Sequence, residues 1–367
     1  MSIQTILGAN GVIGRELSRH LSAYTDRIRQ VSRTPRRVHP TDDLLSADLL
    51  DPKATADAVA GSSVAYLVAG LKYDHRVWQN EWPRVMRNAI DACKRHNTAL
   101  VFFDNVYAYG RVDGVMTEET PYNPRSRKGE LRARIATMFM DEVKRGELRG
   151  MIVRSADFYG SGAVLSLTHA TVTQRLKAKK TPQWVGNPKA VHTFTYTPDA
   201  GRTIALLGNT ATAYGQVWHA LTSHDHMTGE QYVRIACELS GRPYGLQVPP
   251  RWMLSPFGRV RSCCSREHGD ALSIRARLPL RQWKGRTGIR AHGHDVPRRY
   301  CRDVEELKNH RCETWRIGSD KNSDPSLRRI GRTTTNTLPM AASQSSSRTS
   351  RSTWFDALAW SIQAGRA

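Results

Sequence analysis

Three glycines near the start of the sequence have the spacing Gly-x-x-Gly-x-x-Gly, at Gly8, Gly11 and Gly14. They stand between a short apolar run, Ile3–Leu7, and a stretch with the apolar spacing of a helix, Val12–Leu21. In such a strand–turn–helix unit the first glycine permits a tight turn, the second lets the backbone approach a pyrophosphate, and the third lets the helix pack close to the sheet. Because free N–H groups at a helix N-terminus attract phosphate, the spacing predicts a dinucleotide site rather than a turn that binds nothing. The predicted phosphate-binding residues are Gly8, Asn10, Gly11, Val12, Ile13 and Gly14.

The end of the second predicted strand, Arg27–Ser32, favours a phosphorylated cofactor. A partner for a ribose 2′-hydroxyl would be an acidic residue here, but Ser32 is followed by Arg33, with Arg36 and Arg37 close behind. A guanidinium at this place can pair with a 2′-phosphate and stack on adenine. We therefore predict NADP, with NAD as the alternative cofactor and a solvated basic loop as the alternative for the arginines. Ser32 and Arg33 are predicted cofactor-binding residues.

The elements that must position these residues form a strand–helix alternation over residues 1–250. Val64–Ala69 is apolar throughout, as a strand covered on both faces should be. Trp78–His96 carries its apolar residues on one helical stripe, and a second buried strand, Ala99–Phe103, follows. A helical stretch, Arg132–Val143, and a strand-like run, Met151–Val153, continue the pattern. The alternation predicts an α/β fold with a Rossmann-type, doubly wound parallel sheet.

The motifs together resemble the extended branch of the short-chain dehydrogenase/reductase superfamily, the NAD(P)-dependent epimerase/dehydratase-like proteins. The resemblance covers residues 3 to about 254 and rests on the glycine spacing, on Asp48 after the third strand, on Val68–Gly70, on Phe103–Gly110 and on Arg154–Gly160. In that family the last of these segments lies beside the nicotinamide ring. The resemblance implies further cofactor contacts at Asp48, Leu49, Val68, Ala69, Gly70, Ser155 and Asp157.

The resemblance also implies how the chain is divided. Residues 1–160 would form the NAD(P)-binding Rossmann domain, and residues 161–255 the substrate domain together with a returning strand and helix. His192–Ala200 is similar to the family's sheet-to-helix element, whereas Gln216–His219 and Thr228–Ser240 are similar to its small substrate domain. Thr228, with Gln231 three residues on, has the form of a helix capping box. A small-molecule substrate is implied, and a homodimer is among the assemblies that the resemblance allows.

The usual catalytic signature of that family, a Ser or Thr and a Tyr-x-x-x-Lys, is missing. The Ser position falls on Asn105, and Tyr-x-x-x-Lys falls on Lys128–Arg132, with no tyrosine between Tyr122 and Tyr159. We predict instead that Lys128 or Tyr107 moves the proton and that Asn105 orients a carbonyl. For Lys128 the alternative is a surface or phosphate-contacting lysine. Tyr109 could also donate a proton, although packing is its more ordinary role.

The excess positive charge is concentrated near the C-terminus. The chain of 367 residues has a formal net charge of +22, and more than half of this excess lies beyond residue 250. Residues 256–367 form a basic, low-complexity tail that we predict to be irregular and without a core. Three interpretations stay open: an out-of-frame reading of the gene, a nucleic-acid-binding tail, or a zinc site from the cysteines and histidines there. The tail has few aromatic residues on which bases could stack, which disfavours nucleic-acid binding. The spacings of its cysteines and histidines match no paired zinc-ligand motif, which disfavours a zinc site.

Several protein classes are excluded or disfavoured. No apolar run approaches the ~20 residues needed to cross a bilayer, and we see no signal peptide, so we expect a cytoplasmic protein. The scattered histidines of the first 250 residues predict no metal site. The leading prediction is a hydride-transferring oxidoreductase, epimerase or dehydratase acting on a small carbonyl or sugar-like substrate. The alternatives are a non-catalytic NADP(H) sensor and a nucleic-acid binder acting through the tail.

Overall fold

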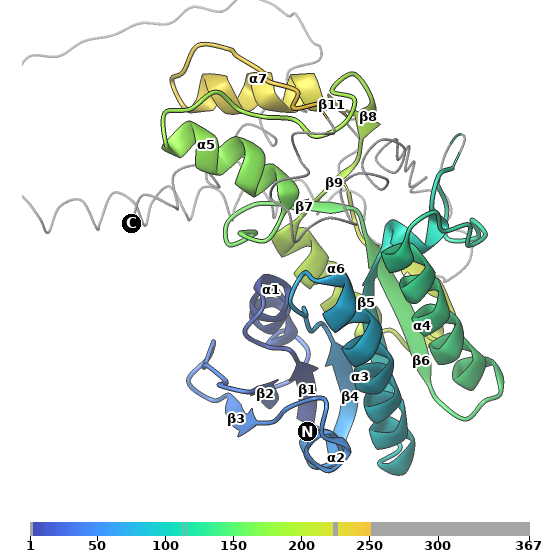
Figure 1. Cartoon of the computed structure of the whole chain (residues 1–367). Coiled ribbons are helices and arrows are strands. Elements are labelled where there is room, and N and C mark those ends of the chain that lie inside the picture. Colours follow the sequence, from blue (N-terminus) through green and yellow to red (C-terminus); the bar gives the residue numbers. More distant parts are fainter. Residues whose placement is uncertain (1–2, 113, 115, 223–226, 251–367) are drawn as a thin grey trace, which may run out of the picture. The chain divides into compact units, whose positions relative to one another are not determined.

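The computed structural model describes residues 3–112, 114, 116–222 and 227–250, and its central element is a sheet of seven strands (Figure 1). In spatial order these are β10 (Val217–His219), β6 (Gly150–Ser155), β5 (Ala99–Asn105), β4 (Ser62–Leu67), β1 (Ile3–Leu7), β2 (Ile28–Ser32) and β3 (Asp43–Ser46). Every neighbouring pair is parallel. The strand order changes direction between β1 and β4, which is where ligands bind in doubly wound sheets. The predicted Rossmann-type fold is confirmed, and the predictions for residues 256–367 lie outside the described residues.

Three helices cover one face of the sheet: α2 (Pro52–Val59), α3 (His75–Arg95) and α4 (Arg127–Lys144) (Figure 1). The core on this face includes Leu67, Phe102 and Ile152 of the strands and Trp82, Ile135 and Phe139 of the helices. All of these side chains are almost completely buried. Burying a side chain of this size contributes ~1.5–3 kcal/mol relative to leaving it exposed, so this layer holds α3 and α4 firmly against the sheet.

A pair of helices, α1 (Val12–Leu21) and α6 (Thr197–Gly208), packs together on the other face. Gly201 makes their close approach possible, because a Cβ at this position would lie 2.5 Å from the carbonyl carbon of Glu16. The helix α6 is anchored at its far end by Asn209, whose side chain accepts a hydrogen bond of 2.7 Å from Gln4 in β1. The segment after residue 160 therefore returns to the Rossmann sheet through α6.

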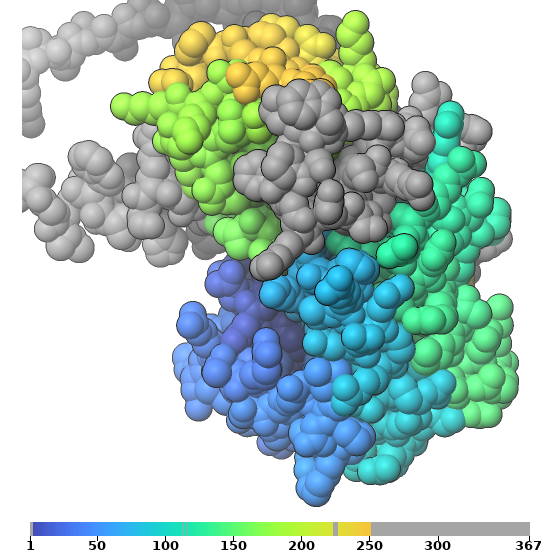
Figure 2. All heavy atoms as spheres, viewed as in Figure 1, coloured from blue at the N-terminus to red at the C-terminus, as the bar shows by residue number. Residues whose placement is uncertain are grey.

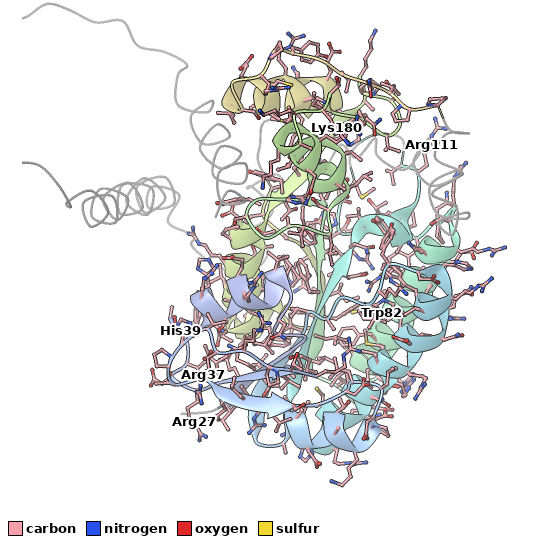
Figure 3. The ribbon with its side chains drawn as sticks, turned by 60° about the vertical axis from the view of Figure 1, so that its left-hand side comes forward. Arg27, Arg37, His39, Trp82, Arg111 and Lys180 are labelled. Atoms are coloured by element: carbon pink, nitrogen blue, oxygen red, sulfur yellow. The ribbon has the colours of Figure 1, made fainter. Side chains whose placement is uncertain are left out.

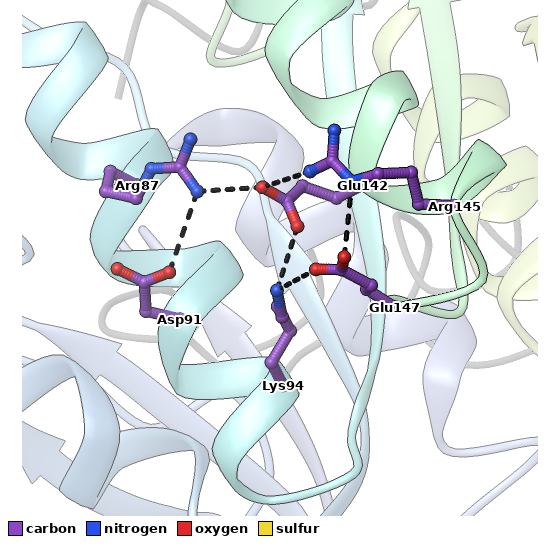
Figure 4. A network of polar contacts seen from close by, with 6 residues as sticks. All are labelled: Arg87, Asp91, Lys94, Glu142, Arg145 and Glu147. Atoms are coloured by element: carbon purple, nitrogen blue, oxygen red, sulfur yellow. Dashed lines mark hydrogen bonds and ion pairs between the residues drawn. The ribbon is translucent and has the colours of Figure 1, made fainter.

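An ionic network joins the second half of α3 to the end of α4 (Figure 4). The Glu142 carboxylate accepts hydrogen bonds from Arg87 and Lys94 of α3, each at 2.9 Å, and pairs with Arg145 at 2.9 Å. Lys94 also pairs with Glu147. The hydrogen bonds from Lys94 and Arg87 lower the pKa of Glu142 to about 2. The network therefore keeps its central negative charge over the whole range in which the protein would ordinarily be studied.

A smaller group of elements follows β6. Strand β7 (Asp157–Tyr159) pairs with β9 (Phe194–Tyr196), and β8 (Val191–His192) pairs with β11 (Met227–Thr228). The helices α5 (Gln174–Lys177) and α7 (Gly229–Leu239) lie together at one end of the described residues (Figures 1 and 2). Tyr159, Trp184, Phe194 and Tyr232 form its aromatic core. The predicted capping box is confirmed, because the Thr228 side chain accepts from the Gln231 N–H and the Gln231 side chain accepts from Thr228.

One sequence-based assignment was wrong. We expected Gln216–His219 in the small substrate domain, but Val217–His219 forms β10, the edge strand of the main sheet. Val217 pairs with Ile152 of β6, and the Trp218 indole donates a hydrogen bond of 2.7 Å to the Ala213 carbonyl. A run of three strand residues has no periodicity that could show which sheet it joins, so only the long-range pairing decides the matter.

Candidate active site

The glycine turn has the conformation that a dinucleotide site requires. Gly8 has a φ of 99°, which few residues other than glycine adopt, and a Cβ there would lie 2.6 Å from the Ala69 backbone nitrogen. Gly14 lies so close to Ala9 that a Cβ would come within 2.7 Å of its carbonyl oxygen. Gly11 is the N-cap of α1 and has no side chain to cap the helix, so the first N–H groups of α1 remain available to an anion.

The loop after β2 is tied to this turn. The Asn10 side chain donates a hydrogen bond of 2.6 Å to the Thr34 carbonyl, and the Ser32 hydroxyl accepts from the Thr34 N–H at 3.2 Å. Arg33 and Arg36 are exposed. Arg37 donates to the carbonyls of Pro40 and Asp42 and so holds the loop together (Figure 3). Arg37 is exposed as well, and these two backbone carbonyls of the loop already accept hydrogen bonds from its guanidinium.

The other predicted cofactor residues lie at the carboxyl edge of the sheet, the edge at which its parallel strands end. Asp48 and Leu49 follow β3, and the exposed Asp48 carboxylate accepts a hydrogen bond of 3.0 Å from the Leu50 N–H. Val68, Ala69 and Gly70 follow β4, where the Val68 N–H donates to the Leu7 carbonyl at 3.0 Å. The structure thus brings the segments after β1, β3 and β4 to one edge.

Ser155 and Asp157 lie on the far side of the same edge. Ser155 is the register partner of Asn105 across β5 and β6, and its hydroxyl donates to the Ala156 carbonyl at 3.0 Å. Burial raises the pKa of Asp157 to about 6, because a charged carboxylate is poorly solvated there. Asp157 therefore exchanges a proton within the range of ordinary experiments.

The three predicted catalytic residues gather where α4 begins. The Asn105 side chain accepts a hydrogen bond of 3.1 Å from the Tyr107 N–H and so caps the short 3-10 helix η1 (Val106–Tyr109). This helix abuts α4, because a Cβ at Gly129 would lie 2.6 Å from the Tyr107 carbonyl oxygen. Lys128 is the preceding residue, and Ser126 caps the helix by accepting from the Gly129 N–H at 3.0 Å. Local capping therefore places Asn105, Tyr107 and Lys128 together.

The Lys128 side chain is buried against aromatic rings and not on the surface. It is 2% exposed, and its Nζ lies 3.0 Å from the centroid of the Tyr73 ring and 5.1 Å from that of Trp78. One turn later the Arg132 guanidinium lies 4.1 Å from the Trp82 ring. Both cations face α3 and the loop before it, where aromatic faces attract positive charge.

A buried ionic cluster lies beneath these residues, and sequence reasoning missed it. Asp104 is 3.3 Å from both Arg132 and Arg154, which approach its two carboxylate oxygens separately. The Arg154 guanidinium lies 4.6 Å from the rings of Tyr109 and Tyr122. The available signal was that Asp104 and Arg154 sit at matching positions near the ends of two successive strands, where they are register partners.

Tyr109 and His219 form a buried pair next to the cluster. The Tyr109 hydroxyl lies 2.9 Å from His219 Nε2, and burial raises the pKa of Tyr109 to about 12. Burial lowers the pKa of His219 to about 4. Both groups are therefore neutral near pH 7, which fits the structural role expected for Tyr109.

The comparison with protein families decides the identity of the chain. A model of the NAD dependent epimerase/dehydratase family matches residues 5–218, which is more than half of the chain. The chain belongs to this family. The resemblance inferred from the glycine spacing and the later motifs is thereby confirmed. No curated protein matches the chain in sequence.

Solved structures of epimerases and dehydratases share the fold of this family member. DesIV, a dTDP-glucose 4,6-dehydratase from Streptomyces venezuelae with NAD and TYD bound, has a TM-score of 0.59 at 17% identity, over 78% of this chain and 95% of its own. The UDP-glucose 4-epimerase of Thermus thermophilus in complex with NAD has a TM-score of 0.60 at 15% identity, over 77% and 92%. MoeE5 in complex with UDP-glucuronic acid and NAD has a TM-score of 0.63 at 20% identity, over 78% and 93%.

The residues of the glycine turn fit the nicotinamide cofactor that the family name implies. The uncapped start of α1 offers N–H donors, and a Cβ at Gly8 or Gly14 would clash with neighbouring backbone atoms of the turn. The family's acid–base tyrosine has no counterpart on α4 of this member, where Lys128 stands instead. Within the described ranges no group of three or more His, Cys, Asp or Glu could hold a metal ion, and no helix there is long and apolar enough to span a membrane.

Proposed function

We propose that this family member transfers a hydride to or from a sugar nucleotide or a small carbonyl substrate, in a reduction, an epimerisation or a dehydration. One observation carries the proposal: the carboxyl edge of the sheet brings the glycine turn, the Val68–Gly70 segment and the group Asn105, Tyr107 and Lys128 together. The substrate class is supported by the neighbours with the same fold, whose bound molecules include TYD and UDP-glucuronic acid.

The roles of the chain's residues follow from their chemistry. A nicotinamide bound at this edge would accept or supply the hydride. Lys128 and Tyr107 are the predicted groups for the accompanying proton, and they lie on adjoining helices. The Asn105 carbonyl oxygen already accepts the Tyr107 N–H, so its amide N–H₂ is the end that would donate to a substrate oxygen.

The cofactor proposed is NADP(H). Arg33 and Arg36 are exposed beside the turn, and Arg33 stands where an acidic residue would favour NAD. Fluorescence titration with NADPH and NADH tests this choice. We expect NADPH to bind more tightly, and Arg33→Asp to reverse the preference. Arg27→Gln is the matched control, because Arg27 is exposed and precedes β2, at the opposite edge of the sheet from Arg33. Failure of both nucleotides to bind at millimolar concentration would refute the proposed function.

Turnover is tested with a panel of nucleotide sugars and small carbonyl compounds. We expect Lys128→Ala to lower kcat by ~10²-fold or more while the Kd of the cofactor changes little. Glu130→Ala is the control, since Glu130 is on the same helix turn but faces solvent. A Lys128→Ala enzyme with the wild-type kcat would remove Lys128 from the mechanism.

A non-catalytic cofactor sensor is the second proposal, and the burial of Lys128 favours it. An amine that is 2% exposed beneath Tyr73 is not positioned to meet a substrate without movement of that ring. A sensor would bind NADPH and show no turnover on any substrate of the panel.

A further inference from the structure

Tyr73 is the residue that covers Lys128. It lies between β4 and α3, four positions after Ala69, whose backbone contacts Gly8 of the glycine turn. Its ring meets the Trp78 ring edge to face, with 5.6 Å between centroids. Tyr73 is 52% exposed. The ring therefore has one face against a buried cation and much of its remaining surface toward solvent.

The contact between Tyr73 and Lys128 is closer than the other cation–ring contacts of this site. Lys128 Nζ is 3.0 Å from the Tyr73 centroid, compared with 4.1 Å between Arg132 and Trp82. The phenol oxygen on the rim of the same ring therefore lies within the ~4–6 Å over which a positive charge favours an ionised partner. An ammonium held in this way stabilises a phenolate more than it stabilises the neutral phenol.

Two other tyrosines of this edge use their hydroxyls in contacts within the fold. Tyr109 is completely buried and its hydroxyl pairs with His219. The Tyr122 hydroxyl accepts a hydrogen bond from Arg154. Tyr107 packs against the apolar core, and its backbone is held by Asn105. Among these tyrosines, Tyr73 alone combines a half-exposed phenol with a buried cation on its ring.

We propose that Tyr73 is the catalytic acid–base residue and that Lys128 is its positioning and electrostatic partner. The inference rests on the proposed function and refines it, because it moves the proton from Lys128 to a phenol on a different element. In the oxidative direction the substrate O–H bond would break and its proton would bond to the Tyr73 phenolate, while the carbinol hydrogen would leave as a hydride, which a bound nicotinamide would accept. Reduction is the reverse, and the proton moves only between the substrate oxygen and Tyr73.

The first test compares Tyr73→Phe with wild type. The variant keeps the ring that covers Lys128 and removes only the hydroxyl, so the fold and the Kd of NADPH should be unchanged. We expect kcat to fall by ~10²–10⁴-fold with KM changed less than about threefold. Tyr24→Phe is the control, because Tyr24 is also partly exposed but follows α1 at the opposite edge of the sheet. Full activity in Tyr73→Phe would overturn the proposal while leaving the proposed function intact.

The second test needs no turnover. Tyrosinate absorbance is titrated in wild type, Tyr73→Phe, Lys128→Met and the double variant, and the contribution of Tyr73 is obtained by difference in each background. We expect Tyr73 to ionise at a lower pH when Lys128 is present than when it is Met. Ionisation at the same pH in both backgrounds would overturn the pairing. If no cofactor binds, the proposed function fails, and this titration still decides the pairing independently.

Discussion

Asp104 offers the most informative perturbation, because its carboxylate lies between two buried guanidiniums. The side chains of Asp104 and Arg154 are fully buried and that of Arg132 is 7% exposed. Asp104→Asn keeps the shape of the side chain and one acceptor oxygen, and removes the charge. The variant therefore isolates the electrostatic contribution of Asp104 to folding.

The expected cost follows from the distances and the burial. Each contact of 3.3 Å corresponds to ~5 kcal/mol of attraction at an effective dielectric constant of ~20, and the desolvation of three ions opposes it. Arg132 Nε and Nη1 and Arg154 Nη1 already have no hydrogen-bond acceptor among the described residues, so no other group can compensate. Removing one partner from a buried pair costs ~3–5 kcal/mol, which lowers Tm by roughly 6–20 °C for a folded region of this size.

The assay is urea unfolding followed by tryptophan fluorescence, since Trp78 and Trp82 contact Arg132 directly. Asp57→Asn is the control: its pair with Lys53 is shorter, at 2.7 Å, but both side chains are exposed, so little change is expected. Equal losses of unfolding free energy in Asp104→Asn and Asp57→Asn would refute the argument that burial, rather than distance, sets the energetic cost of removing the carboxylate. In a double-mutant cycle, Arg132→Met should cost less in the Asp104→Asn background than in wild type.

Two further predictions use the same purified protein. Gly8→Ala should abolish NADPH fluorescence enhancement, because a Cβ would overlap the Ala69 backbone and φ is 99°; binding near the wild-type Kd would contradict this. Burial raises the pKa of Asp157 to about 6, above its unfolded value, so stability should decline as pH rises from about 4 to about 6. At pH 7 the free energy of unfolding of Asp157→Asn, measured with urea, should then exceed that of wild type by ~2–3 kcal/mol. Near pH 3.5 the two free energies should be equal.

Features that depend on neighbours in the sequence could be predicted from the sequence alone. The glycine turn, the apolar strand before it and the Thr228–Gln231 capping box each follow from a few consecutive residues. The strand–helix alternation likewise predicted a parallel sheet, because burial on both faces leaves continuous apolar runs such as Val64–Ala69. The glycine spacing together with the motifs after the later strands was enough to indicate the family.

The tertiary structure decided which distant residues meet. Asp104 joins Arg132 and Arg154 because β5 pairs with β6 in a register that no local pattern reveals. Lys128 meets Tyr73 only because α4 packs beside α3 and the loop that precedes it.

The family resemblance put Lys128 at the position of the missing tyrosine, but it could not show that a phenol from another element covers the lysine. Burial and charge pairing depend on the whole fold, because desolvation is set by every element packed around a group. For this protein the sequence by itself determined the cofactor-binding scaffold, and the packing of α3 against α4 determined which side chains surround Lys128.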